Sequence, residues 1–251
     1  MQVAFQTDIG RQRQNNQDYV QAYSNQAGAT LAVVADGMGG HRGGDVASKM
    51  VVEHLGSAFE QTQMADIETI THWAKELLLV ENRRVIKASQ EQLDLKGMGT
   101  TLVAAVVVEP DLLVLNVGDS RCYLFREQQL QQLSFDHSLV NELLVAGAIT
   151  PLEAKNYPNK NIITQSLGVS SGLEPTAKRL TLESQDQVLL CSDGLTNMVS
   201  ETKIAEILAQ PLTTQAKCDL LVKCANQAGG LDNITVLILD LQAHCEVKPD
   251  D

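Results

Sequence analysis

The chain has 251 residues, of which 44% are hydrophobic and 20% charged, a globular composition that excludes a disordered or collagen-like chain. The 31 Asp and Glu residues outnumber the 19 Lys and Arg residues and give a net charge of −12, which argues against binding to nucleic acid or an anionic membrane. The longest apolar run, Leu102 to Val108, is far too short to span a bilayer, so we expect no membrane insertion.

The N-terminus and the cysteines indicate where the protein works. No basic region followed by an apolar core opens the chain, so the sequence predicts no signal peptide. The cysteines are odd in number and form no CxxC pair, which is typical of buried thiols in a reducing cytosol. They are Cys122, Cys191, Cys218, Cys224 and Cys245. We therefore expect a cytoplasmic protein, and we expect it to be a monomer.

The first third of the chain predicts three strands and two helices. The strand-like segments are Val3–Thr7, Tyr19–Tyr23 and Leu31–Ala35. Apolar residues then recur at helical spacing over Asp45–Phe59 and again over Ile67–Gln92.

The middle of the chain returns to strands with short links, which favours antiparallel pairing of consecutive strands. These strands are Thr100–Val108, Leu112–Val117, Arg121–Phe125 and Gln129–Leu133.

The last part of the chain opens with an irregular stretch, 138–180, that holds one predicted helix, and it then mixes further helices and strands. The predicted elements are a helix at Leu139–Ala146, a strand at Gln187–Cys191, helices at Ile204–Leu208 and Ala216–Ala228, and a strand at Asn233–Leu241. Because helices and strands occur in groups, we expect an α+β fold: two packed antiparallel sheets covered by helices. No linker divides the sequence, so we expect one domain, 1–245, with a short tail, 246–251.

Five aspartates stand where predicted strands begin or end, namely Asp18, Asp36, Asp119, Asp193 and Asp232. Strands that deliver such residues to one edge of a sandwich would gather their carboxylates, whose repulsion raises their pKa values unless cations bind. Carboxylate and backbone oxygens are hard ligands suited to Mg²⁺ or Mn²⁺, and no His or Cys cluster has the spacing of a zinc site.

Each of these elements also has a plain structural interpretation when taken alone. An Asp-Gly pair after a strand is more often a turn than a ligand. The glycine run 37–40 can be a loop that enters a helix, or it can allow close backbone approach to a metal through the Gly37 carbonyl. Out of context, Arg13 is most simply a surface arginine in a polar turn.

The residues of the motifs and their order along the chain decide between these interpretations. Along the chain they are Thr7-Asp-Ile-Gly10, Arg13-Gln-Asn-Asn-Gln-Asp18, Val34-Ala-Asp-Gly-Met-Gly-Gly-His41, Met98-Gly-Thr-Thr101, Val117-Gly-Asp-Ser-Arg121, Asp136-His-Ser138, Ile163-Thr-Gln-Ser-Leu-Gly168, Cys191-Ser-Asp-Gly-Leu195 and Asp232-Asn-Ile-Thr235. This series resembles the metal-dependent, type 2C serine/threonine protein phosphatases in their single-domain Gram-positive form, over residues 3–241.

The resemblance implies a central antiparallel β-sandwich with helices on both outer faces, and two divalent metals, Mn²⁺ or Mg²⁺, at one end of it. A third, weaker metal is also implied. By motif position, Asp36 and the Gly37 carbonyl, with Asp193 and Asp232, would hold the two metals; Asp119 and Asp193 would hold the third; and Asp18 would support the site. Many eukaryotic members have Glu where this chain has Gln17, which argues against direct ligation by the 17–18 pair.

The resemblance also implies the chemistry. A hydroxide that bridges the metals would attack phosphorus in line, with no phosphoenzyme, while Arg13 grips the phosphate oxygens. Met38 stands where some members have a catalytic histidine, which leaves His41 and a water on the third metal as candidate general acids. For His137 we favour a structural role in capping or packing.

The expected activity is hydrolysis of phosphoserine and phosphothreonine in proteins, opposing a cognate serine/threonine kinase. Residues 138–180 match the flap beside the family's metal site. Two alternatives stay open at this point: a hydrolase of small phosphate esters, and a catalytically decayed module that binds phosphoproteins.

Overall fold

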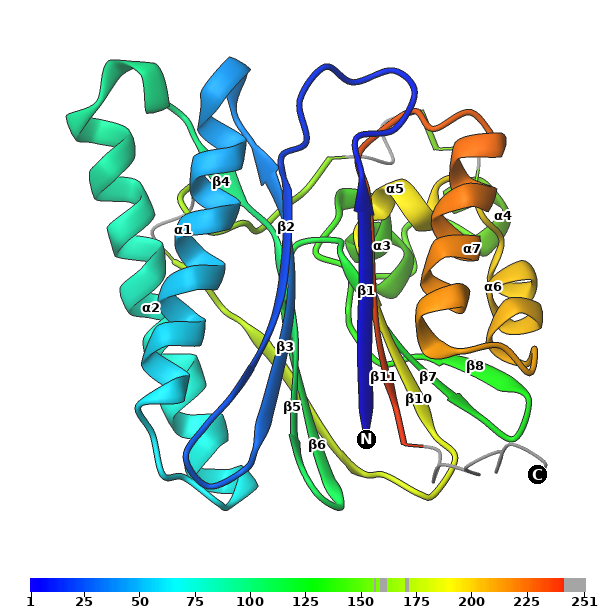
Figure 1. The fold of residues 1–251 in the computed structure, drawn as a ribbon. Helices are drawn as coiled ribbons and strands as arrows, with labels where there is room; N and C mark the ends of the chain where they lie inside the picture. Colours follow the sequence, from blue (N-terminus) through cyan, green and yellow to red (C-terminus); the bar gives the residue numbers. More distant parts are fainter. Residues whose placement is uncertain (156, 159–161, 170–171, 242–251) are drawn as a thin grey trace.

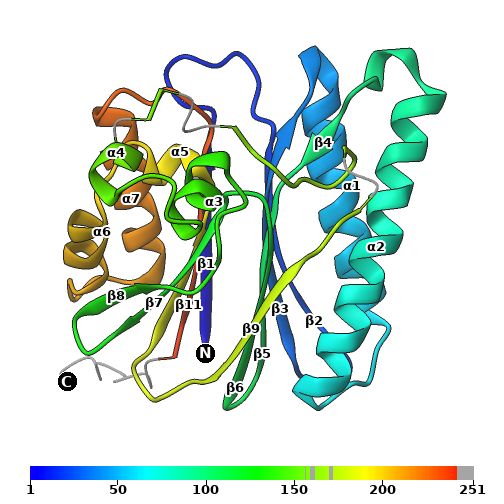
Figure 2. The ribbon, with the colours of Figure 1, turned by 180° about the vertical axis from the view of Figure 1, so that it is seen from behind.

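The structure is a computed structural model that describes residues 1–155, 157–158, 162–169 and 172–241, and the side chains of these residues except at positions 40–42 and 155. The chain forms four layers, with helices outside two facing sheets (Figures 1 and 2). The α+β sandwich with helices on both faces, predicted from the sequence, is therefore confirmed. The expected tail, 246–251, lies outside the described residues, as do residues 242–245 of the expected domain.

Sheet A joins the two ends of the described chain. Its β1 and β10 both pair antiparallel with β11, and β10 also pairs with β7. In spatial order the sheet consists of β1 (Gln2–Asp8), β11 (Ile234–Asp240), β10 (Gln187–Cys191), β7 (Arg121–Arg126) and β8 (Gln129–Gln132).

Sheet B holds the remaining strands, and all of its pairings are antiparallel. In spatial order it consists of β2 (Asp18–Ser24), β3 (Thr30–Met38), β5 (Leu102–Val108), β6 (Asp111–Val117) and β9 (Thr176–Thr181), with the short β4 (Gly99–Thr100) paired to the end of β3.

The helices divide between the two outer faces. Helices α1 (Gly40–Glu60) and α2 (Ile67–Glu91) cover sheet B, and a 3₁₀ turn, η1 (Leu93–Leu95), follows them. Helices α5 (Asp193–Thr196), α6 (Glu201–Leu208) and α7 (Thr214–Gln227) cover sheet A. The short α3 (Leu139–Val145) and α4 (Pro151–Lys155) belong to the segment between the sheets' strands β8 and β9.

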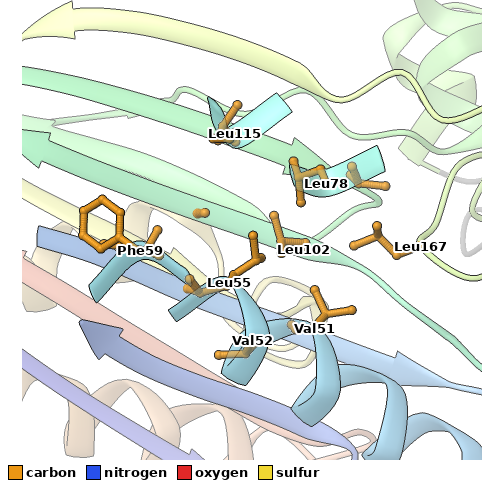
Figure 3. Close-up of a cluster of buried hydrophobic side chains, with 14 of the residues drawn as sticks. Val51, Val52, Leu55, Phe59, Leu78, Leu102, Leu115 and Leu167 are labelled. Carbon is orange, nitrogen blue, oxygen red and sulfur yellow. The ribbon is translucent and has the colours of Figure 1, made fainter. Parts of the chain in front are cut away.

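Strand β3 shows why the central strands are apolar on both faces. Successive side chains of a strand point to opposite sides. Leu31 and Val33 lie in the core under α1 and α2, while Ala32 and Val34 lie in the core between the sheets. Figure 3 shows the first of these cores, where Leu167 packs among side chains of α1, α2 and sheet B. The flap segment is therefore anchored in the main body of the protein at Leu167.

The structure corrects four details of the predicted elements. Helix α1 begins at Gly40 rather than Asp45, because Gly43 and Gly44 are helical despite their low propensity. The strand predicted at Thr100–Val108 is divided at Thr101. Strands β6 and β7 do not pair with each other: their short link crosses from sheet B to sheet A. Residues 176–180, assigned to the flap, are part of β9, which pairs with β6.

Candidate active site

All five predicted aspartates lie at the same end of the sandwich. Asp18 and Asp36 face each other directly across the β2–β3 pair. Asp193 follows β10 and Asp232 precedes β11, which are neighbours in sheet A. Asp119 lies in the link that crosses from β6 to β7. Carboxylates that are up to 214 residues apart in the chain thus meet where the two sheets end.

Two glycines let the backbones that carry these aspartates approach closely. A Cβ at Gly37 would lie 2.0 Å from the carbonyl oxygen of Gly44, so β3 and the start of α1 could not pack as they do with any larger residue. A Cβ at Gly194 would lie 1.9 Å from the carbonyl oxygen of Asn233. In each Asp-Gly pair, the glycine therefore allows the neighbouring aspartate to lie close to another segment of the site.

The electrostatics of this end disfavour ionised carboxylates. Burial, followed by the charges of Asp18, Asp193, Asp119 and Asp232, raises the pKa of Asp36 well above its ordinary value. Burial and the same kind of repulsion raise the pKa of Asp18 and that of Asp119 to about 7 each, and they raise the pKa of Asp193. The carboxylates are thus close enough to repel one another strongly.

Three of these carboxylates each keep one buried oxygen without a hydrogen-bond partner: Oδ1 of Asp18, of Asp119 and of Asp193. A buried carboxylate oxygen with no donor is costly, and native structures show few of them. Such oxygens, gathered at one end and belonging to hard ligands only, fit divalent cations such as Mg²⁺ and Mn²⁺.

Three other carboxylate oxygens of the site accept hydrogen bonds from protein side chains. Arg13 Nη2 donates to Asp232 Oδ2 at 2.7 Å, Asn197 Nδ2 donates to Asp193 Oδ2 at 2.9 Å, and the Ser192 hydroxyl donates to Asp18 Oδ2 at 2.7 Å. No three Asp, Glu, His or Cys side chains of the described residues converge as a ready-made metal site. Side chains of the cluster would have to move closer together to share a cation.

Arg13 brings a positive charge to the acidic end of the molecule. Its guanidinium pairs with Asp232, and its side chain is 52% exposed, so it remains accessible from solvent. The arginine that the sequence singled out for phosphate therefore lies beside the aspartates, as that interpretation needs.

The two histidines considered in the sequence analysis differ in what can be said of them. The side chain of His41, the candidate general acid, lies outside the described residues; its backbone is in the first turn of α1. His137 is buried, and its ring Nδ1 accepts a hydrogen bond from Gly118 N at 3.1 Å. The backbone N–H of His137 donates to Gly118 O at 2.9 Å. His137 therefore holds the peptide beside Asp119, in keeping with the expected structural role.

Several polar residues that support the site were not singled out from the sequence. Thr101 Oγ1 accepts from Asp36 N at 3.0 Å and shares a hydrogen bond with Ser120 Oγ at 2.7 Å, which links the Asp36 strand to the Asp119 link. Asn233, next to Asp232, bonds three backbone groups of the segment that carries Arg13. Their motifs, Gly-Thr-Thr and Asp-Asn, were visible, but the partners become visible only in three dimensions.

None of the helices in the described ranges has the length and apolar character that a membrane span would need.

Comparison with known proteins places these observations in a family. The model of the family described as protein phosphatase 2C matches residues 7–226. Protein phosphatase PhpP of Streptococcus pneumoniae is 45% identical over 241 residues, which cover 96% of this chain and 98% of PhpP.

Solved structures of phosphatases share the fold of this chain. The serine/threonine phosphatase of S. agalactiae superposes with a TM-score of 0.91 at 44% identity, covering 94% of this chain and 98% of that one. The catalytic domain of the serine threonine protein phosphatase PstP, solved with 2 manganese ions, superposes with a TM-score of 0.83 at 35% identity, covering 96% and 98% of the two chains.

Proposed function

The chain belongs to the protein phosphatase 2C family and is a serine/threonine protein phosphatase, and from that premise we propose how its aspartate end performs the reaction. The observation that carries the proposal is the set of partnerless, mutually repelling carboxylate oxygens of Asp18, Asp119 and Asp193 around Asp36. The family is metal-dependent, and the oxygen-only donor set of this end suits the manganese ions of the PstP structure.

Four groups of the chain would hold the two principal cations, each through an oxygen: the carboxylates of Asp36, Asp193 and Asp232 and the carbonyl of Gly37. Asp119, together with Asp193, would contribute to a third, weaker site, and Asp18 would support the arrangement from behind. When bound, Mn²⁺ or Mg²⁺ neutralises these carboxylates and phosphate oxygens and makes water more acidic. The raised pKa values of these aspartates reflect the free-energy cost of ionising them in the folded chain, and bound cations would offset that cost.

Arg13 would bind the phosphate of the substrate. Its planar guanidinium can donate two parallel hydrogen bonds to phosphate oxygens, and it supplies a positive charge in a protein whose net charge is −12. To do so it would exchange Asp232 Oδ2, its present partner, for the phosphate. This exchange would free the Asp232 carboxylate for its role as a ligand.

The departing serine or threonine oxygen needs a proton. Met38 follows Gly37 and cannot donate one, so we propose His41 as the donor from the chain itself, with the third site at Asp119 as the competing source. Both belong to segments that meet Asp36: α1 begins directly after β3, and Thr101 joins the Asp119 link to β3.

The substrates would be proteins phosphorylated by a partner serine/threonine kinase, in the cytoplasm, with the phosphatase acting as a monomer. The site supports protein substrates and a monomer because residues of one chain build it at one end of the sandwich, and because Leu167 of the flap segment pairs with Thr100, whose hydroxyl donates to Asp36 O. Residues 139–155 of that segment carry exposed apolar side chains such as Val145 and Leu152, which could contact a polypeptide.

The test is hydrolysis of a phosphothreonine peptide by the purified protein after chelation, with Mn²⁺ or Mg²⁺ added back. We expect activity to depend on the added cation and to exceed that on phosphorylated sugars or nucleotides. Full activity in the chelated sample would contradict the metal proposal, and a preference for the small esters would contradict the assignment of protein substrates.

A further inference from the structure

The segment that carries Arg13 has no regular secondary structure. Residues 9–17, called the Arg13 loop below, connect β1 of sheet A to β2 of sheet B. Residues 11–15 at its centre are exposed, and the loop stands out beyond the strands at the end where the aspartates meet (Figure 1). A loop of this kind would place a guanidinium poorly unless something limits its conformations.

One buried side chain, that of Asn233, binds the loop at both of its ends. Its Nδ2 donates to Ile9 O and to Asn15 O, each at 2.9 Å, and its Oδ1 accepts from Gln17 N at 2.8 Å. Asn233 is only 5% exposed, so it binds the loop from the interior of the protein. A single asparagine thus fixes the start of the loop, its end, and the residue two positions after Arg13.

The end of the loop is in turn held by sheet B. Gly37 N donates to Gln17 O at 3.1 Å, and the Ser48 hydroxyl of α1 donates to the same oxygen at 2.7 Å. The backbone of Gln17 therefore lies between Asn233, directly before β11 of sheet A, and Gly37 in β3 of sheet B. Through this peptide, the loop is placed relative to both halves of the aspartate cluster.

The amide of asparagine is needed here for a chemical reason. Its two N–H groups serve two carbonyls while its oxygen serves one N–H, and neither aspartate nor leucine, of similar size, offers that combination. Loss of the amide would leave three backbone groups of the loop without this partner, and the loop would gain conformations that do not present Arg13.

We propose that Asn233 is a positioning residue for phosphate binding: by clamping both ends of the Arg13 loop it holds Arg13 where a phosphate can reach it. The proposal rests on the proposed role of Arg13 as the phosphate-binding residue. The Asn233 side chain contacts neither substrate nor metal, and its backbone N–H, which Asn233→Ala keeps, donates to Asp232 Oδ1 at 2.9 Å. It acts through Arg13, and its effect should therefore vanish when Arg13 is absent.

The chain offers a matched control in Asn25. This asparagine is 6% exposed and also clamps a loop: its Oδ1 accepts from Ala27 N and Ala29 N, and its Nδ2 donates to Thr62 Oγ1 and Met64 O. It lies in the β2–β3 turn, at the opposite end of the sandwich from Asp18. Asn25→Ala should therefore cost stability as Asn233→Ala does, without touching phosphate binding.

The experiment is a double-mutant cycle that measures inhibition by inorganic phosphate and the KM of a phosphopeptide. The proteins are wild type, Arg13→Ala, Asn233→Ala, the double variant and Asn25→Ala, at saturating Mn²⁺ and at a temperature where each is folded by circular dichroism. We expect Asn233→Ala to raise the phosphate Ki and the KM by roughly tenfold, because a misplaced binding group loses most of its effect. In the Arg13→Ala background the same change should do little, and Asn25→Ala should leave both constants unchanged.

The outcomes separate the two claims. An equal rise of Ki on Asn233→Ala with and without Arg13 would overturn the positioning role while leaving Arg13 as the phosphate-binding residue. An unchanged Ki in Arg13→Ala would overturn the assignment of Arg13 and the positioning role with it. If Asn233→Ala does not fold, Asn233→Ser keeps one hydroxyl for the clamp; we expect an intermediate Ki that again depends on Arg13, and a wild-type Ki would contradict the proposal.

Discussion

The two ends of the sandwich bury carboxylates in opposite ways. At the end away from the site, Asp186 precedes β10 and is 1% exposed, and the Arg126 guanidinium donates to both of its oxygens, at 2.9 and 2.6 Å. The Glu183 N–H donates to Asp186 as well, at 2.8 Å. At the site end, Asp36 is surrounded by four other aspartates, and the charges of all four raise its pKa.

The difference separates a structural carboxylate from a functional one. The charge of Asp186 is balanced within the chain, so the fold needs nothing else at that end. The arginines whose charges act on the aspartates around Asp36 are already paired, Arg13 with Asp232 and Arg121, near Asp119, with Asp136. A cluster that lowers the stability of the folded chain and is nevertheless built by several strand ends points to cations as its missing partners.

The largest expected effects come from exchanging one carboxylate for an amide at each end. Asp36→Asn should reduce phosphopeptide turnover by roughly a hundredfold or more, because it removes the charge of a proposed ligand oxygen, and it should stabilise the chelated protein by removing repulsion. Asp186→Asn should keep turnover and lose about 2 kcal/mol of stability, because Arg126 is only partly buried and retains Glu183. Steady-state kinetics measure the turnover of both variants, and urea unfolding measures their stability. Equal changes in turnover and stability for the two variants would contradict the distinction between the two ends.

The next effect tests Asp119, whose link is built like a turn. An asparagine there could make similar turn hydrogen bonds but would be a poorer ligand. We expect Asp119→Asn to keep the fold and the two principal cations while losing most turnover on phosphopeptides. The comparison is with His41→Ala, with metal content determined for both. Near-normal turnover in Asp119→Asn together with collapse in His41→Ala would assign the proton to His41.

A smaller effect is expected from Arg13→Ala. The loss of a charge-assisted contact to phosphate should cost roughly 1.5–3 kcal/mol, seen mainly as a raised KM. Arg126→Ala is the comparison at the other end, and it should lower stability while leaving KM unchanged. An unaltered KM in Arg13→Ala would contradict the proposal that Arg13 binds the phosphate of the substrate.

The pH dependence of stability gives the smallest effect and sharpens the comparison further. Burial raises the pKa of Asp18 and that of Asp119 to about 7 in the folded chain, above the unfolded value near 4. The protonated forms therefore favour folding at low pH, and this contribution is lost as pH rises through 7. We expect the Tm of chelated protein to fall by several degrees between pH 5.5 and 8, since about 1 kcal/mol corresponds to roughly 2–4 °C at this size. The fall should be weaker in Asp36→Asn, and a flat or rising Tm in wild type would contradict the repulsion.

The sequence was informative where local pattern and tertiary role agree. Each aspartate stands at or near the beginning or end of a strand, so its place at one end of a sheet could be predicted from the apolar runs beside it. Strand β9 could not, because Thr176–Thr181 is a largely exposed edge strand with Lys178 and Arg179, without an apolar pattern. What makes this segment a strand is its pairing with β6, a long-range contact that the local sequence does not reveal.

The link at Asp119 and the clamp at Asn233 show the same limit. The link Gly118-Asp119-Ser120 is short enough to close a hairpin, but β6 and β7 belong to different sheets. The length of a link does not indicate whether the strands that it joins pair with each other. Asn233 lies next to a recognised aspartate, yet its partners Ile9, Asn15 and Gln17 are more than two hundred residues away.

The central claim is that divalent cations complete the aspartate end of the molecule. The most direct measurement is the change in Tm of chelated protein on adding Mn²⁺, for wild type, Asp36→Asn and Asp186→Asn, because a ligand at a hundred times its Kd stabilises the folded state by about 2.7 kcal/mol. We predict a rise of several degrees in wild type, the same rise in Asp186→Asn from its lower starting Tm, and little or none in Asp36→Asn. An equal rise in all three, or none in wild type, would contradict the account.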